Sequence, residues 1–179
     1  MNTRTRVLTG TALAAVIGAG TFGAVSASAT AAPAAAVAKK DDDRNFTTST
    51  HLTVDAATRA ARAALDAAEK ENQRVTVAVV DRNGNTIVTL RGDGAGPQSY
   101  ESAERKAFTA VSWNAPTSVL AGRLAQTPNL KDIPGTLFLG GGTPVQAKGA
   151  PVAGIGVAGA PSGDLDEKFA KAGVDALDK

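Results

Sequence analysis

The sequence VAVVDRNGNTIVTLRGDGAG, Val77–Gly96, decides the fold because it predicts a chain that turns back on itself. The valine-rich run 75–80 is typical of a β-strand. Asn83-Gly84 is the strongest short signal for a hairpin turn, because both residue types accept a positive φ. Residues 85–91 then return as the partner strand, so we expect an antiparallel sheet that contains this hairpin.

Helices are predicted on both sides of the hairpin. Residues 52–72 form a long helix with Thr53 at its N-cap and a stripe of alanines along one side. Residues 99–113 form a second helix, which Asn114-Ala115-Pro116 ends. The apolar side of this second helix consists of Ala103, Ala107, Ala110 and Val111.

The C-terminal half predicts further strands and helices. A short helix is predicted over 117–125, with Thr117 as its cap, and a strand is predicted over 137–139. A second hairpin is predicted, with one strand at 144–148 and the other at 152–157. A closing helix covers 164–177, with acids in its first turn. This order of elements predicts an α+β domain in which helices pack on one antiparallel sheet.

The chain is divided into three parts. Residues 1–29 read as a secretory signal peptide: Arg4 and Arg6 precede an apolar run, and small residues follow it. Residues 30–50 are rich in alanine and charge, without apolar periodicity, and predict a disordered leader. Residues 51–179 remain for one folded domain of ordinary size.

Composition excludes several classes of function. The chain has 19 basic and 17 acidic residues. Removal of the signal peptide removes Arg4 and Arg6, which leaves the charges balanced and gives no general attraction to nucleic acid. The chain has no cysteine, which excludes thiolate chemistry. It has one histidine and one methionine, so two histidines of one chain cannot both bind a haem iron.

Residues 99–116, SYESAERKAFTAVSWNAP, carry the side chains most suited to chemistry. Glu101 and Glu104 share a helix face and could hold a hard cation such as Fe(III). The alternative is that they are solvated acids, with Glu101 paired to Arg105 one turn later. Arg105 and Lys106 could bind a carboxylate, or could serve solubility alone.

These segments, together with GTLFLGGGTPV at 135–145, resemble the GlcG/HbpS family of haem-binding proteins from about Leu52 to the C-terminus. The resemblance implies a profilin-like domain with about five antiparallel strands and flanking helices. It also implies a homo-oligomer, an octamer in the best-matched members, with haem b and an iron ion as cofactors.

The resemblance also implies functional roles for residues that the sequence pattern alone would interpret as ordinary structural or surface residues. It implies that Thr136 and His51 contribute to haem binding, although Thr136 alone reads as a strand residue and His51 as a solvated residue before a helix. It places haem propionates near Arg105 and Lys106, with Lys131 as a weaker candidate. Finally, it assigns iron to Glu101 and Glu104, with the remaining ligands from water or another subunit.

The function implied is that of a secreted, extracellular or cell-wall-associated protein that binds haem and iron and senses haem and redox stress. It would modulate a two-component system through the extracellular part of a membrane sensor histidine kinase. Two alternatives remain open: a haem-degrading enzyme of the same family, and a module that binds cobalamin or another small molecule. The single histidine and an oxygen ligand for haem favour binding over catalysis.

Overall fold

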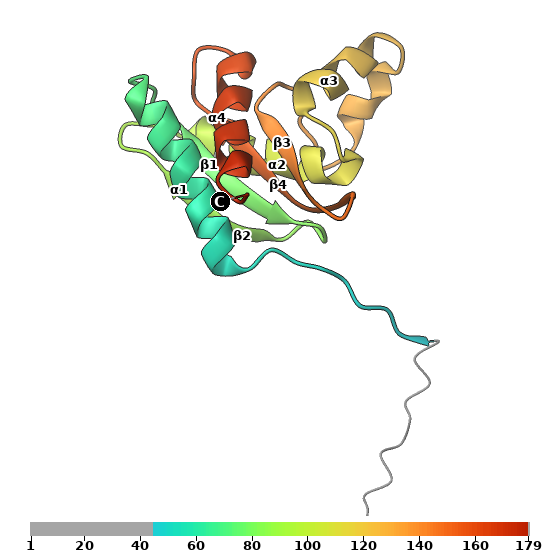
Figure 1. Ribbon diagram of the computed structural model, residues 1–179. Coiled ribbons are helices and arrows are strands. Elements are labelled where there is room, and N and C mark those ends of the chain that lie inside the picture. Colours follow the sequence, from blue (N-terminus) through green and yellow to red (C-terminus); the bar gives the residue numbers. More distant parts are fainter. Residues whose placement is uncertain (1–44, 179) are drawn as a thin grey trace, which may run out of the picture. The chain divides into compact units, whose positions relative to one another are not determined.

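Antiparallel pairing builds one sheet of four strands, in the order β2-β1-β4-β3 (Figure 1). The structure is a computed structural model that describes residues 45–178. The signal peptide predicted at 1–29 and the first part of the leader, 30–44, lie outside the described residues. The strands are β1 (Thr76–Asp81), β2 (Thr86–Arg91), β3 (Gly142–Ala147) and β4 (Ala150–Ala158).

The α+β class is confirmed, but the predicted fifth strand over 137–139 is wrong. The segment is bound to helix α2 (Gln98–Trp113) instead of the sheet: Leu137 N–H donates to Thr109 Oγ1 at 2.8 Å. The ring of Phe138 meets that of Trp113 edge-on, with centroids 5.3 Å apart. A helix side chain therefore satisfies the backbone group that a strand partner would otherwise have bound.

The predicted hairpin turn forms, and an aspartate stabilises it. Asp81 Oδ1 accepts hydrogen bonds from the N–H groups of Asn83 (2.8 Å) and Asn85 (2.9 Å). Gly84 has φ +89°, whereas Asn83 keeps a negative φ, so only one turn residue needs the left-handed region. Partial burial raises the pKa of Asp81, but the two N–H donors and the nearby charge of His51 lower it more, leaving the pKa below its usual value.

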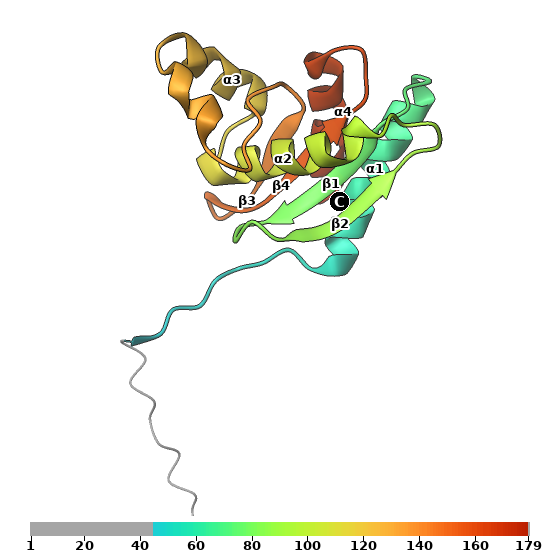
Figure 2. The ribbon, with the colours of Figure 1, turned by 180° about the vertical axis from the view of Figure 1, so that it is seen from behind.

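Helices cover both faces of the sheet. Helices α1 (Val54–Lys70) and α4 (Gly163–Asp175) pack on one face, and α2 crosses the other, as Figures 1 and 2 show from opposite sides. Helix α3 (Thr117–Gly122) follows α2 and continues into two short 3₁₀ turns, at 123–125 and 128–132. Among residues 45–178, no helix combines the length and the apolar character needed to cross a membrane.

The helix caps were predicted with mixed success. Thr53 caps α1 as predicted, because its hydroxyl accepts from Ala56 N–H at 3.2 Å. The predicted cap of α3 by Thr117 is wrong: the Thr117 hydroxyl accepts from Gly142 N–H at 2.8 Å and so fixes the start of β3.

The two faces of the sheet pack differently against their helices. Val75, Val77 and Ile155 belong to the large core beneath α1 and α4, which also includes the fully buried Phe169. The face beneath α2 carries Ala78 and Val80 from β1, while β4 presents Gly154 and Gly156 there. A Cβ at Gly154 would overlap the carbonyl oxygen of Ala107, and one at Gly156 would overlap that of Ala103. Helix α2 therefore lies with its backbone directly against β4.

Replacement of Gly156 by alanine should strongly destabilise the domain. The new methyl group would overlap the Ala103 carbonyl and lie 2.5 Å from Ala107 N, so α2 would have to move. We expect a loss of about 2 kcal/mol or more in the free energy of unfolding, measured by urea denaturation.

The matched control for that measurement is Gly122→Ala in α3. No atom lies within 4 Å of a Cβ there, so this variant should be as stable as the parent or gain up to about 1 kcal/mol. Equal urea midpoints for Gly156→Ala and the parent would show that α2 and β4 are not in backbone contact.

Candidate functional site

One exposed face of α2 gathers most of the predicted site residues. Glu101, Glu104, Arg105 and Phe108 follow the spacing i, i+3, i+4, i+7, and we call them the α2 outer face. The Glu101 side chain is 78% exposed, and the other three residues are half-buried. The α2 outer face lies between strand β2 on one side and the loop 133–139 on the other, as the hydrogen bonds of Glu104 and Arg105 show.

Arg105 connects the acidic pair to that loop. Its Nη2 donates to the carbonyl oxygen of Thr136 at 2.7 Å, and its Nη1 lies 3.6 Å from Glu101 Oε1. Glu104 is held separately, because its Oε1 accepts from the hydroxyl of Thr89 on β2 at 3.2 Å. The structure thus places Glu101, Glu104, Arg105 and Thr136 in one neighbourhood.

The Thr136 hydroxyl is covered in this conformation. The residue is 2% exposed, and its Oγ1 donates to the carbonyl oxygen of Ile133 at 2.7 Å. The N–H of Thr136 bonds to the same carbonyl at 3.3 Å, which closes a tight turn over 133–136. An iron ion could reach this hydroxyl only if that turn opened.

Phe108 belongs to the same face, and the sequence analysis missed it. A Cβ at Gly84 would lie 2.9 Å from Phe108 Cε2, and one at Gly135 would lie 3.5 Å from Cε1. The hairpin turn and the loop that carries Thr136 therefore approach the same ring. Its position seven residues after Glu101 was the available signal, because residues i and i+7 share a helix face.

Lys106 points away from this face into the protein. It is 5% exposed, and its Nζ lies 2.7 Å from Asp166 Oδ2 and 3.0 Å from the carbonyl oxygen of Val157. Asp166 is 3% exposed and also accepts from Ala160 N–H at 3.0 Å. Burial raises the pKa of Asp166, although Lys106 opposes the rise. The structure separates Lys106 from Arg105, and a propionate could reach Lys106 only if this ion pair opened.

His51 and Lys131 also lie apart from the α2 outer face. His51 is exposed just before α1, the helix on the opposite face of the sheet, and its Nε2 is 2.6 Å from Ser49 Oγ. Lys131 is exposed in the 3₁₀ turn at 128–132. The single chain does not bring His51 into contact with Arg105 or Thr136.

The acidic pair is a partial set of metal ligands. Within residues 45–178, no group of three or more His, Cys, Asp or Glu side chains is arranged to hold a metal ion. Glu101 and Glu104 supply carboxylate oxygens, the ligand type that hard cations prefer. Water or a second subunit would have to complete the coordination.

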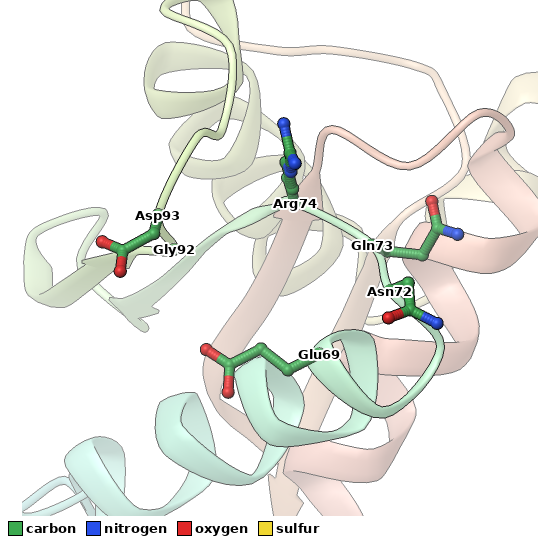
Figure 3. A pocket seen from close by; sticks show the side chains of 6 residues that line it. All are labelled: Glu69, Asn72, Gln73, Arg74, Gly92 and Asp93. Atoms are coloured by element: carbon green, nitrogen blue, oxygen red, sulfur yellow. The ribbon is translucent and has the colours of Figure 1, made fainter.

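Hollows also occur elsewhere on the domain, and two of them differ in their walls. One of about 430 Å³ lies where α1 ends and β2 leads into the glycine loop. Figure 3 shows charged and amide groups around it, from Glu69, Asn72, Gln73, Arg74 and Asp93. It has no aromatic or aliphatic wall for a porphyrin. A second cleft of about 490 Å³ lies above the Lys106–Asp166 pair and includes Leu139 and Gly140.

The comparisons point to one family. Residues 52–175 match the family model described as haem degrading protein HbpS-like. A crystal structure of HbpS is 82% identical with a TM-score of 0.72, and the match covers 73% of this chain and 92% of that chain. The search of curated proteins finds no significant match.

Two further crystal structures are informative. One is a Streptomyces reticuli HbpS double mutant in which two glutamates three residues apart are replaced by aspartate. It is 75% identical with a TM-score of 0.73, and the match covers 81% of this chain and 96% of that one. The other is a complex of PduOC with haem, 26% identical with a TM-score of 0.65, over 71% of this chain and 95% of that one.

Removing one partner of the Lys106–Asp166 pair should lower the free energy of unfolding more than replacing both partners by apolar residues. Lys106→Met leaves a buried carboxylate without its partner, and we expect a loss of about 3 kcal/mol in the free energy of unfolding at pH 7. In urea denaturation, the double variant Lys106→Met/Asp166→Leu should lose less free energy of unfolding than either Lys106→Met or Asp166→Leu alone.

The single variant should also respond to pH. A carboxyl whose pKa is raised by folding stabilises the fold below its unfolded pKa and loses that contribution as the pH rises through the folded value. The deficit of Lys106→Met should therefore shrink on acidification from pH 7 towards pH 5. A deficit independent of pH, or a double variant as unstable as the sum of the singles, would contradict a buried ion pair.

Proposed function

This chain belongs to the HbpS-like family of haem degrading proteins, and from that premise we propose that it is a secreted haem- and iron-binding protein that senses haem and redox stress. The observation that carries the proposal is the α2 outer face. This face presents two carboxylates and an accessible guanidinium, and the guanidinium contacts the loop that bears Thr136.

The residues present fit a haem group in part. Arg105 is 40% exposed in its side chain and can donate to a propionate, and Phe108 offers an apolar ring beside it. His51 offers an exposed imidazole, which a neighbouring subunit of a homo-oligomer could bring to the site. The Thr136 hydroxyl fits only after the 133–136 turn has opened. When bound, haem supplies a redox-active iron, and these side chains bind and orient it.

The acidic pair supports iron binding. In the Streptomyces reticuli protein, the two glutamates changed to aspartate are three residues apart. In this sequence, Glu101 and Glu104 are the glutamates with that spacing. Their carboxylates suit a hard cation, so we assign them to iron that is not part of haem.

Titration of the mature protein with haemin tests the haem site. We expect a shifted Soret band, and Arg105→Gln should weaken haemin binding about tenfold, because it removes one charge-assisted hydrogen bond to a carboxylate. His51→Ala and Thr136→Ala should also weaken it. Lys171→Gln is the control, since Lys171 pairs with Asp175 on the exposed side of α4.

Two results would refute this assignment. One is the absence of any spectral change at micromolar haemin. The other is a set of site variants that bind as tightly as Lys171→Gln. Glu101→Gln/Glu104→Gln should weaken the binding of free iron without weakening that of haemin, which separates the two proposed sites.

Haem degradation is the second candidate, and the description of the family favours considering it. The α2 outer face is open to solvent, whereas oxygen activation at haem needs a site that excludes water. In air with a reductant, we expect bleaching of the Soret band to stop when catalase is added. Bleaching that survives catalase would establish enzymatic degradation, and a tighter titration with cobalamin than with haemin would favour the cobalamin-binding alternative.

We extend the proposal to assembly and signalling. The signal peptide predicted at 1–29 supports a location outside the cell, where an octamer would meet the extracellular part of a sensor histidine kinase. Light scattering on the purified protein should give the mass of eight chains. Kinase autophosphorylation in membrane vesicles should change when the haemin-loaded protein is added, and an unchanged rate would remove the kinase from the proposal.

A further inference from the structure

The guanidinium of Arg105 contacts both proposed sites: the loop that bears Thr136, assigned to haem, and the carboxylate of Glu101, assigned to iron. Nη2 is bound to the Thr136 carbonyl oxygen at 2.7 Å, and Nη1 lies 3.6 Å from the carboxylate of Glu101. Glu101 has no other hydrogen-bond or ion-pair partner among residues 45–178, and its side chain is 78% exposed. The contact with Glu101 is therefore the looser of the two and the easier to exchange.

The Arg105–Glu101 pair is the contact around this site that exchanges most easily, because its atoms are 3.6 Å apart and the Glu101 side chain is 78% exposed. Glu104 is restrained by its hydrogen bond to Thr89. The loop 133–139 is anchored to α2 further along by the Leu137–Thr109 bond and by the contact of Phe138 with Trp113. Among the contacts named here between the loop and α2, the Arg105–Thr136 bond is the one made by a charged side chain, and that side chain is 40% exposed. A change in charge at Glu101 acts first on this side chain.

We propose that Arg105 couples the two sites, so that a cation bound at Glu101 and Glu104 tightens the binding of haem. This inference rests on the proposed function. A haem propionate and the Glu101 carboxylate compete for the same guanidinium. A bound cation removes this competition, because it neutralises the Glu101 carboxylate and releases Arg105 to the propionate.

The coupling must work in both directions. If the cation raises the affinity for haemin by some factor, haemin raises the affinity for the cation by the same factor. Because the groups are partly exposed, we expect about a fivefold effect at low ionic strength, and a smaller one as salt screens the charges.

The test measures haemin affinity with and without Mn²⁺, a hard cation whose own binding is followed by electron paramagnetic resonance. In the unaltered mature protein, Mn²⁺ should tighten haemin binding about fivefold, and haemin should tighten Mn²⁺ binding equally. Glu101→Gln/Glu104→Gln should bind haemin about fivefold more tightly without Mn²⁺ and show no further response to it. Arg105→Gln should bind haemin weakly, with or without Mn²⁺.

A control pair with the same change in charge is available on α1. Asp66 and Glu69 are also three residues apart and share one arginine, Arg62, at 2.7 and 3.7 Å. They lie on the helix that covers the opposite face of the sheet. Asp66→Asn/Glu69→Gln should leave both haemin affinity and its response to Mn²⁺ unchanged.

The outcomes separate this inference from the proposed function. Haemin and Mn²⁺ that both bind without affecting each other would overturn the coupling and leave the haem site intact. A response to Mn²⁺ that persists in Arg105→Gln, or equal effects from the α1 control pair, would overturn the role of Arg105. Failure of Mn²⁺ to bind would remove the cation site and the coupling with it. Failure of haemin to bind under any condition would overturn the proposed function itself.

Discussion

The backbone contact between α2 and β4 is the constraint on which the rest of the structure depends. Side chains at Gly154 or Gly156 would overlap the helix carbonyls of Ala107 and Ala103. With glycine at both places, the backbone of the helix can lie directly against β4. This fixes the rotation of α2 about its own axis, and that rotation decides which side chains face solvent.

The same rotation gives neighbouring residues opposite roles. Arg105 and Lys106 are consecutive, and consecutive helix residues point about 100° apart. Arg105 reaches the Thr136 loop at the surface, whereas Lys106 turns inward to Asp166 and the Val157 carbonyl. The buried pair ties the centre of α2 to the start of α4, so that the outer face is supported from within the fold.

Much of the site could be read from the sequence, and the errors have physical causes. The spacing of Glu101, Glu104 and Arg105 placed them on one helix face, because helical periodicity is a local property. The same periodicity could have excluded Lys106 from that face, since it lies three residues after Ala103 and four before Ala110, both buried. The expected strand at 137–139 failed because its backbone partner is the Thr109 side chain, a contact between segments distant in sequence.

The sequence by itself determined the local elements, namely the hairpin at Asn83-Gly84, the Thr53 cap and the apolar side of α2, because turn chemistry, capping and periodicity act within a few residues. Only the tertiary structure decided that Arg105 bridges Glu101 and Thr136, that Thr136 is covered, and that Lys106 is paired with Asp166 inside the fold. These facts depend on how distant segments pack, and packing is set by the shape of the whole core and not by any local pattern.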